Sequence, residues 1–174
     1  NKLLRIYDEE KIDIKVVPID DINAYSIEEK IMYILNNSLG LKEESKIKLI
    51  DEYKKRVYED DRRGKEVETK KYYQFIKYKI AFCYRYFGIN DDIKSFLCFN
   101  NFSIKSNSSI KEKDLIDLFK IIALDNNFDY VKPTFVSARN FIEKFDESKE
   151  QLSRGCKVFW ISTYKTIGSG KNIQ

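Results

Sequence analysis

The residues best suited to chemistry stand at the end of the chain, in WISTYKTIGSGKNIQ (residues 160–174). Gly168 to Lys171 read GSGK, and a glycine-rich loop followed by lysine is a common phosphate-binding arrangement. The Walker A pattern G-x-x-x-x-G-K-[ST] would need its first glycine at Lys165 and a hydroxyl residue at Asn172. Both defining positions fail, so Lys171 is not expected to cradle a phosphate.

What remains is a buried strand predicted over residues 157–162, which runs into a polar loop with two glycines. Ligands of open α/β sheets bind outside the carboxyl ends of the strands. Hydroxyl groups and backbone N–H groups can hold phosphate oxygens without reading bases, and glycine lets the backbone approach closely. The loop therefore indicates a contact site for a phosphate or a nucleic-acid backbone, and an ordinary strand-to-helix turn is the alternative.

The segment TFVSARNF…ESKEQLSRGCKVFWISTYKTIGSGKNIQ resembles the second RecA-like lobe of superfamily 2 helicases and translocases. Within it, ISTYKTIGSGKNIQ resembles motif V, in the Ser-Thr…Gly-x-Gly-x-Asn-[Leu/Ile] form of DEAD/DEAH-like enzymes. The resemblance covers roughly residues 110–174. Residues 137–139, after the preceding predicted strand, occupy the place of a motif IV-type loop and are a weaker match.

The resemblance implies two sets of site residues. The first would contact DNA or RNA at the backbone: Ser137, Arg139, Ser162 and Thr163. The second would lie at the nucleotide cleft between the lobes and couple it to the nucleic acid: Gly168, Gly170 and Asn172.

Phosphoryl transfer needs a lysine, a metal ion and a positioned cation on the phosphates. The Walker A lysine, the Walker B acidic pair and the motif VI arginine of such enzymes do not occur in this sequence. We therefore expect the chain to be part of a longer helicase, with ATP, Mg²⁺ and the first RecA-like lobe as its partners. This part alone is expected to bind no cofactor and to hydrolyse no ATP.

Two domains are predicted, in an α/β fold with a parallel sheet preceded by a mainly α-helical region. Residues 1–105 are a helical accessory or insertion region, and residues 106–174 are a partial RecA-like lobe, after a linker near 100–110. The first part contains an extended segment at 12–19 and helices at 27–39, 43–60, 65–87 and 91–99. The second alternates helix and strand, with helices at 111–125 and 146–154 and strands at 134–137 and 157–162.

The helix at 65–87 interleaves basic and aromatic residues, which permits two interpretations. Lys77 and Lys79 could contact a nucleic-acid strand while the aromatic rings stack on bases. Alternatively, the rings belong to the core and the lysines face solvent. Helical spacing favours the core for Tyr72, Ile76, Ile80, Cys83 and Phe87. By the same spacing, Ile47, Ile50, Tyr53, Val57 and Tyr58 mark the buried side of the preceding helix.

Composition narrows the function classes further. The 174 residues carry 32 Lys and Arg against 28 Asp and Glu, a net charge of +4 that permits nucleic-acid binding without requiring it. The absence of histidine excludes histidine-dependent triads within this chain and removes the commonest zinc ligand. Cys83, Cys98 and Cys156 stand among apolar residues and are expected to be buried thiols in a cytoplasmic protein.

Two other functions stay open from the residues alone. One is a non-catalytic helical protein-interaction domain with a small α/β appendage. The other is a complete nucleotide-binding protein that uses GSGKN directly.

Overall fold

The structure is a computed structural model, and it describes residues 25–59, 64–101, 104 and 109–163. The extended segment predicted at 12–19 lies outside the described residues. Most of the predicted linker at 100–110 and the GSGK loop lie outside them as well.

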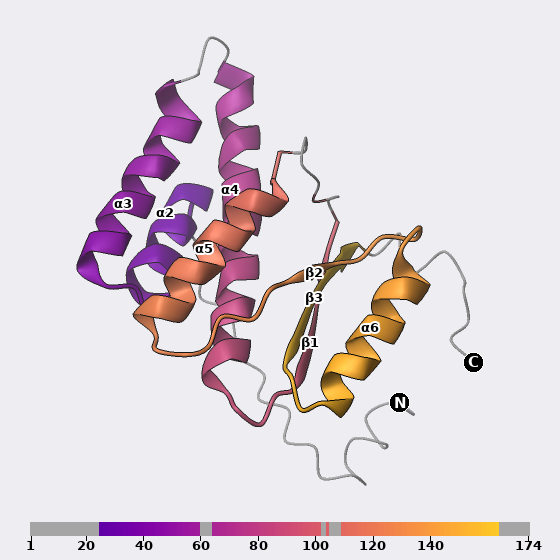
Figure 1. Cartoon of the computed structure of the whole chain (residues 1–174). Coiled ribbons are helices and arrows are strands. Elements are labelled where there is room, and N and C mark those ends of the chain that lie inside the picture. The colour runs from indigo at the N-terminus through magenta and orange to yellow at the C-terminus, as the bar shows by residue number, and fades with distance from the viewer. Residues whose placement is uncertain (1–24, 60–63, 102–103, 105–108, 164–174) are drawn as a thin grey trace, which may run out of the picture.

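Helices form the larger part of the molecule (Figure 1). They confirm the predicted helices near 27–39, 43–60, 65–87 and 111–125. Two of them continue into a short π-helical turn, so that the elements are α2 (Ile27–Tyr33) with η2 (Ile34–Ser38), α3 (Glu43–Lys54) with η3 (Lys55–Glu59), α4 (Gly64–Ile89) and α5 (Glu112–Asp125).

The start of α2 follows from its first residues. The hydroxyl of Ser26 accepts a hydrogen bond from the Glu29 N–H at 3.2 Å, and the Ser26 N–H donates to the Glu29 carboxylate at 2.7 Å. These reciprocal bonds form a capping box, which satisfies two backbone N–H groups that the helix leaves without partners. The sequence spacing Ser26-x-x-Glu29 predicts this cap.

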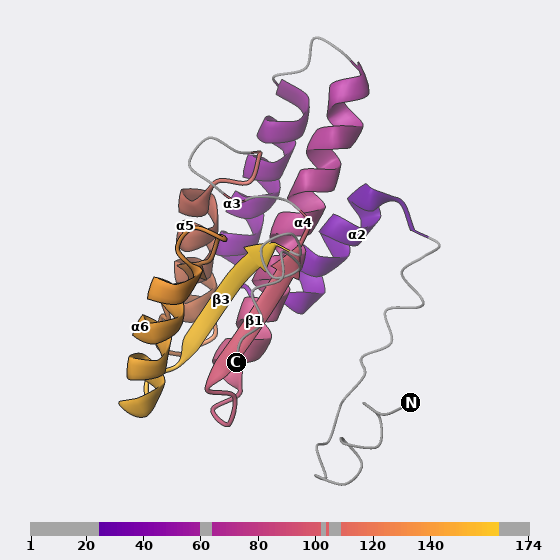
Figure 2. The ribbon, with the colours of Figure 1, turned by 90° about the vertical axis from the view of Figure 1, so that its right-hand side faces the viewer.

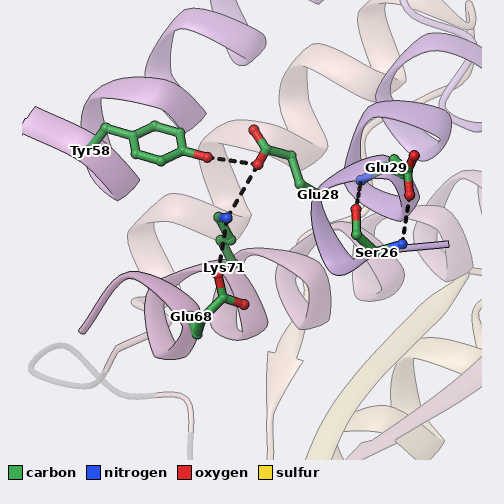
Figure 3. A network of polar contacts seen from close by, with 6 residues as sticks. All are labelled: Ser26, Glu28, Glu29, Tyr58, Glu68 and Lys71. Carbon is green, nitrogen blue, oxygen red and sulfur yellow. Dashed lines mark hydrogen bonds and ion pairs between the residues drawn. The ribbon is translucent and has the colours of Figure 1, made fainter. Parts of the chain in front are cut away.

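A second polar cluster, shown in Figure 3, joins α2, η3 and α4. Glu28 accepts a hydrogen bond from the Tyr58 hydroxyl at 2.7 Å and pairs with the Lys71 ammonium at 3.3 Å. Lys71 also pairs with Glu68 at 3.0 Å and lies over the Tyr58 ring. Tyr58 therefore acts through its exposed hydroxyl, and the prediction that it faces the core is wrong, as it is for Ile47 and Tyr72.

Within the described residues, three strands form one parallel sheet in the order β1-β3-β2. They are β1 (Ser95–Asn100), β2 (Thr134–Phe135) and β3 (Val158–Thr163). β1 pairs with β3 along its whole length, from Ser95 opposite Val158 to Asn100 opposite Thr163. The predicted strands at 134–137 and 157–162 are thereby found, the first of them shorter than expected.

The predicted helix at 91–99 is wrong, because residues 95–100 form β1. Phe96, Cys98 and Asn100 lie on the more buried face of β1, while Leu97 between them is exposed. This alternation has the period of a strand, and the Phe96 ring stacks on Phe159 of β3 with centroids 5.3 Å apart. A contact with a residue far along the chain decides the conformation here, and local spacing does not reveal it.

The sheet lies between two helical layers, with α4 and α5 on one face and α6 (Phe141–Ser153) on the other (Figures 1 and 2). α6 begins earlier than the predicted helix at 146–154. Phe141 and Phe145 in its first turns pack edge-on against Trp160 of β3, and Ser148 accepts a hydrogen bond from the Trp160 indole N–H at 2.7 Å. These contacts explain the additional helical turn.

One hydrophobic core contains residues of both predicted domains. β1 lies before the predicted boundary at residues 105 and 106, and its partner β3 lies after it. Buried residues of α2, α3 and α4 belong to the same apolar cluster as Phe119 of α5 and Phe159 of β3. In the part of the chain that the structure describes, no helix is long and apolar enough to cross a membrane.

Gly40, after η2, offers a direct test of this packing. Its φ is +60°, and a Cβ there would lie 2.1 Å from the Asn126 side-chain oxygen and 2.7 Å from the Arg85 guanidinium. Those two groups hydrogen-bond to each other at 2.7 Å, and the Asn126 amide donates to the Leu39 carbonyl. Gly155 has a φ of +80° with nothing within 4 Å of its Cβ position, which makes it the matched control.

We expect Gly155→Ala to cost about 1–2 kcal/mol of folding free energy, from backbone strain alone. Gly40→Ala should cost about 2–4 kcal/mol, because overpacking of Asn126 and Arg85 adds to the same strain. Urea unfolding of both variants measures the difference, and equal costs would contradict the packing described for Gly40.

Candidate functional site

The carboxyl ends of the three strands meet at one edge of the sheet, because the strands are parallel. Asn100 at the end of β1 lies opposite Thr163 at the end of β3, and Phe135 at the end of β2 lies opposite Ile161. The predicted residues Ser162, Thr163, Ser137 and Arg139 are thus brought to the same edge. We call this group, with Asn100 and Asn140, the carboxyl-edge cluster.

Asn100 joins β1 to β3 within this cluster. It is 7% exposed, and its amide donates a hydrogen bond to the Ser162 carbonyl at 3.1 Å. A buried amide with a backbone partner fixes the relative position of two strands, since removal of the partner would leave a polar group without compensation. Asn100 was not predicted, because the predicted helix ends at residue 99 and Asn100 falls in the predicted linker at 100–110.

Ser162 joins β3 to the chain that follows β2. Its hydroxyl donates to the Val136 carbonyl at 3.1 Å, and the residue is only 2% exposed. The Val136 N–H in turn donates to the Ile161 carbonyl at 2.9 Å. The Ser162 hydroxyl is therefore buried and hydrogen-bonded within the protein. Thr163 beside it is half-buried.

The turn after β2 is organised by Asn140. Its side-chain oxygen accepts hydrogen bonds from the Ser137 N–H at 2.7 Å and from the Ser137 hydroxyl at 3.0 Å. Its amide donates to the Phe135 carbonyl at 3.1 Å. This local ring of bonds closes the turn and leaves Arg139 exposed at its tip. Asn140 was not predicted, although an asparagine directly before a helix is a usual turn signal.

The chemistry of the carboxyl-edge cluster is that of amides, hydroxyls and one guanidinium. Such groups bind phosphate oxygens well, whereas Mg²⁺ prefers carboxylate and water oxygens. The cluster itself does not fit a magnesium ion. Among the residues that the structure describes, no group of three or more His, Cys, Asp and Glu side chains could hold a metal.

The two predicted basic residues of α4 differ in placement. Lys79 is exposed, with its ammonium over the Phe75 ring. Lys77 is buried, with 4% of its surface exposed, and does not present its charge at the surface. Burial, reinforced by the nearby charge of Arg56, lowers the pKa of Lys77 to about 8.

Arg56 and Asp114 form the ion pair beside Lys77. The guanidinium donates two parallel hydrogen bonds to the carboxylate, at 2.7 and 3.0 Å. Burial acts to raise the pKa of Asp114, but the Arg56 hydrogen bonds and charge, together with Lys77, lower it overall. This pair connects η3 to the first turn of α5, with the Arg56 side chain 43% exposed at the surface above the buried Lys77.

The three residues predicted for the nucleotide cleft, Gly168, Gly170 and Asn172, lie outside the described residues.

Comparison with family models, with curated proteins and with solved structures finds no match to this chain. What the carboxyl-edge cluster does must be inferred from its residues and their geometry.

The buried charge of Lys77 predicts a pH-dependent stability. Between pH 8 and the ordinary lysine pKa of 10.5, the unfolded chain holds a proton that the folded protein has released. The free energy of unfolding therefore rises with pH across that range. Below about pH 8 the folded protein bears the full cost of burying the charged ammonium. Lys77→Met should raise the free energy of unfolding at pH 7 by about 1–3 kcal/mol.

The gain from Lys77→Met should shrink when unfolding is repeated toward pH 10, and the exposed neighbour Lys79→Met should change stability little at either pH. A Lys77→Met protein that is less stable than wild type at pH 7 would show that the charge is compensated in the fold.

Asn100 can be tested against the residue after it. Asn100→Ala should lower the free energy of unfolding by about 1–3 kcal/mol, because the Ser162 carbonyl loses its donor inside the protein. Asn101 is exposed, and Asn101→Ala should change stability by less than about 0.5 kcal/mol. Equal losses of stability for the two variants in chemical unfolding would show that Asn100 does not join β1 to β3.

Proposed function

We propose that this chain is part of an ATP-dependent helicase or translocase, with its sheet in the second RecA-like lobe and its carboxyl-edge cluster against a nucleic-acid backbone. One observation carries the proposal. The motif V-like sequence follows the central strand of a parallel sheet, at an edge where hydroxyl, amide and guanidinium groups gather from all three strand ends.

Within this proposal the cluster residues have different roles. Arg139 is exposed at the tip of the turn after β2, where its guanidinium can pair with a phosphate. Thr163 is half-buried at the end of β3, beside the chain that leads to the glycines. Asn100, Ser162 and Asn140 hold the backbone near Arg139 and Thr163 in place, through hydrogen bonds to backbone carbonyls.

The same hydrogen bonds suggest how the loop after β3 would be coupled to the nucleic acid. The Ser162 carbonyl and hydroxyl are held by β1 and by the segment after β2, so a displacement of the loop at Thr163 would be resisted by both neighbours. A force at the nucleotide cleft would then reach the Arg139 turn through Val136, three residues before it. ATP and Mg²⁺ belong in this proposal to the full-length protein, together with its first lobe.

Arg139 and Arg154 make a matched pair for testing the backbone contact. Both are exposed arginines, and they flank α6 at its opposite ends, Arg139 within the carboxyl-edge cluster and Arg154, which pairs with Glu150, at the other edge of the sheet. We expect Arg139→Ala to weaken binding of a labelled single strand several-fold. The slope of log affinity against log salt should also become shallower by about 0.7 for each phosphate that the Arg139 guanidinium neutralises in the wild-type complex.

Arg154→Ala should leave both the affinity and the slope unchanged, which separates a local contact from the removal of one positive charge. Fluorescence anisotropy at several salt concentrations, with DNA and with RNA, measures these quantities. Binding by wild type that is insensitive to salt, or an absence of binding, would favour a non-catalytic helical interaction domain instead.

A further inference from the structure

β1 closes one side of the sheet, and its backbone on that side can pair with another strand. The Val158 N–H donates to the Lys94 carbonyl at 2.8 Å, which fixes the hydrogen-bonding phase between β1 and β3. In a parallel ladder the two backbone groups of a residue point to the same side, and successive residues alternate. The N–H and carbonyl groups of Ser95 and Leu97 therefore point away from β3, and no strand in the described part of the chain pairs with them. We call this side the outer edge of β1.

The composition of β1 is that of a strand inside a sheet. SFLCFN has no charged residue and no proline, whereas exposed edge strands are usually protected by such residues. Its apolar run FLCF is typical of strands buried within parallel sheets. Leu97 is nevertheless 42% exposed. β1 thus has the composition of a strand that a further strand covers.

The surface of α4 beside this edge is apolar as well. The Tyr84 ring stacks on α5, and the Phe87 ring packs against β1 and β3. Helical rotation puts Cys83 and Tyr86 on the other side of Phe87 from Tyr84, beyond β1. Tyr86 is 40% exposed, and Cys83 is partly buried, whereas Cys156, also expected to be buried, is exposed. A strand about 4.8 Å outside β1 would cover Cys83 and Tyr86, as β1 and β3 cover Phe87.

We propose that residues 12–17, IDIKVV, form a strand that pairs in parallel with the outer edge of β1. The hand of the connections selects this segment. β1 leads to β2 through α5 on one face of the sheet, and β2 leads back to β3 through α6 on the other face, so both connections have the same hand. A strand before α2 would reach β1 through α4, on the α5 face, and the same hand then places it on the side of β1 away from β3. Because such connections are almost always right-handed, the outer edge is the position expected for this strand.

The segment has the pattern that this position requires. Ile12, Ile14 and Val16 alternate with Asp13 and Lys15. In a strand, this alternation gives one apolar face, which would cover the exposed side chains of α4, and one polar face, which would meet solvent.

The direction of the chain fits as well. Glu28 in the first turn of α2 pairs with Lys71 in the first half of α4. β1 follows α4 after a short turn and packs back along it, so a strand parallel to β1 would end on the side where α2 begins (Figure 2). From residue 17 to Tyr25 the chain can span about 26 Å. The inference rests on β1 and α4, and it does not depend on the proposed function.

The test is NMR of the isotope-labelled full chain. We expect nuclear Overhauser effects between backbone protons of residues 12–17 and those of Ser95 and Leu97, because neighbouring strands bring these protons together. The Leu97 amide should exchange with deuterated solvent at least about tenfold more slowly than the amide of Asp92, in the exposed turn before β1. Absence of these Overhauser effects, or exchange at Leu97 as fast as at Asp92, would overturn the proposal.

Two proline variants identify the segment that covers the edge. If the Ile14 side chain faces α4, its N–H points to β1, so Ile14→Pro should speed exchange of the Leu97 amide at least about tenfold. The Cys98 amide, which bonds to β3, should keep its rate. Ile6→Pro is the matched control, because it makes the same change outside the segment and should alter neither rate.

The remaining outcomes would overturn the assignment. Protection of Leu97 that survives Ile14→Pro but falls on dilution would give the edge to a second copy of the chain. Equal acceleration by Ile14→Pro and Ile6→Pro would contradict a strand at residues 12–17. If Ile14→Pro also speeds exchange at Cys98, the variant has loosened the whole sheet, and the Overhauser effects in the wild-type chain decide the question.

Discussion

The packing of β3 between two helical layers is the constraint on which the rest of the structure depends. Phe159, fully buried, contacts the rings of Tyr84, Phe87, Phe96 and Phe119, with centroids 5.2 to 5.7 Å apart. The next residue, Trp160, points to the other face and packs on α6. Because successive side chains of a strand alternate between faces, this pair of aromatic residues fixes which face of β3 meets which layer.

The polar edge follows from that orientation. Because Phe159 and Ile161 face the layer of α4 and α5, Ser162 must face the α6 side, where its hydroxyl donates to the Val136 carbonyl. Asn100 reaches the Ser162 carbonyl because β1 pairs with β3 in register. A shift of β3 by one residue would reverse both faces and break these bonds, so aromatic packing in the core determines the geometry of the carboxyl-edge cluster.

The elements with a strong local signal could be predicted from the sequence. The capping box at Ser26, the long amphipathic helices and the apolar strand KVFWIS each carry their signal within a few residues. β1 could not be identified in this way, because SFLCFN becomes a strand by pairing with residues 158–163 and by stacking of Phe96 on Phe159. The burial of Lys77 was missed for a similar reason, since its neighbours Arg56 and Asp114 come from η3 and α5.

The candidate site shows the same division between local and distant causes. The parallel sheet brings Ser162, Thr163, Ser137 and Arg139 to one edge. The resemblance to helicase motifs had implied a contact with the nucleic-acid backbone for all four. It treated these residues as equivalent contacts, whereas the fold separates them. The Ser162 hydroxyl donates its hydrogen bond inside the protein, whereas the bonds of Asn140 close a turn that leaves Arg139 exposed. A residue that positions the edge and a residue that can touch a ligand therefore require different tests: unfolding for the first and salt-dependent binding for the second.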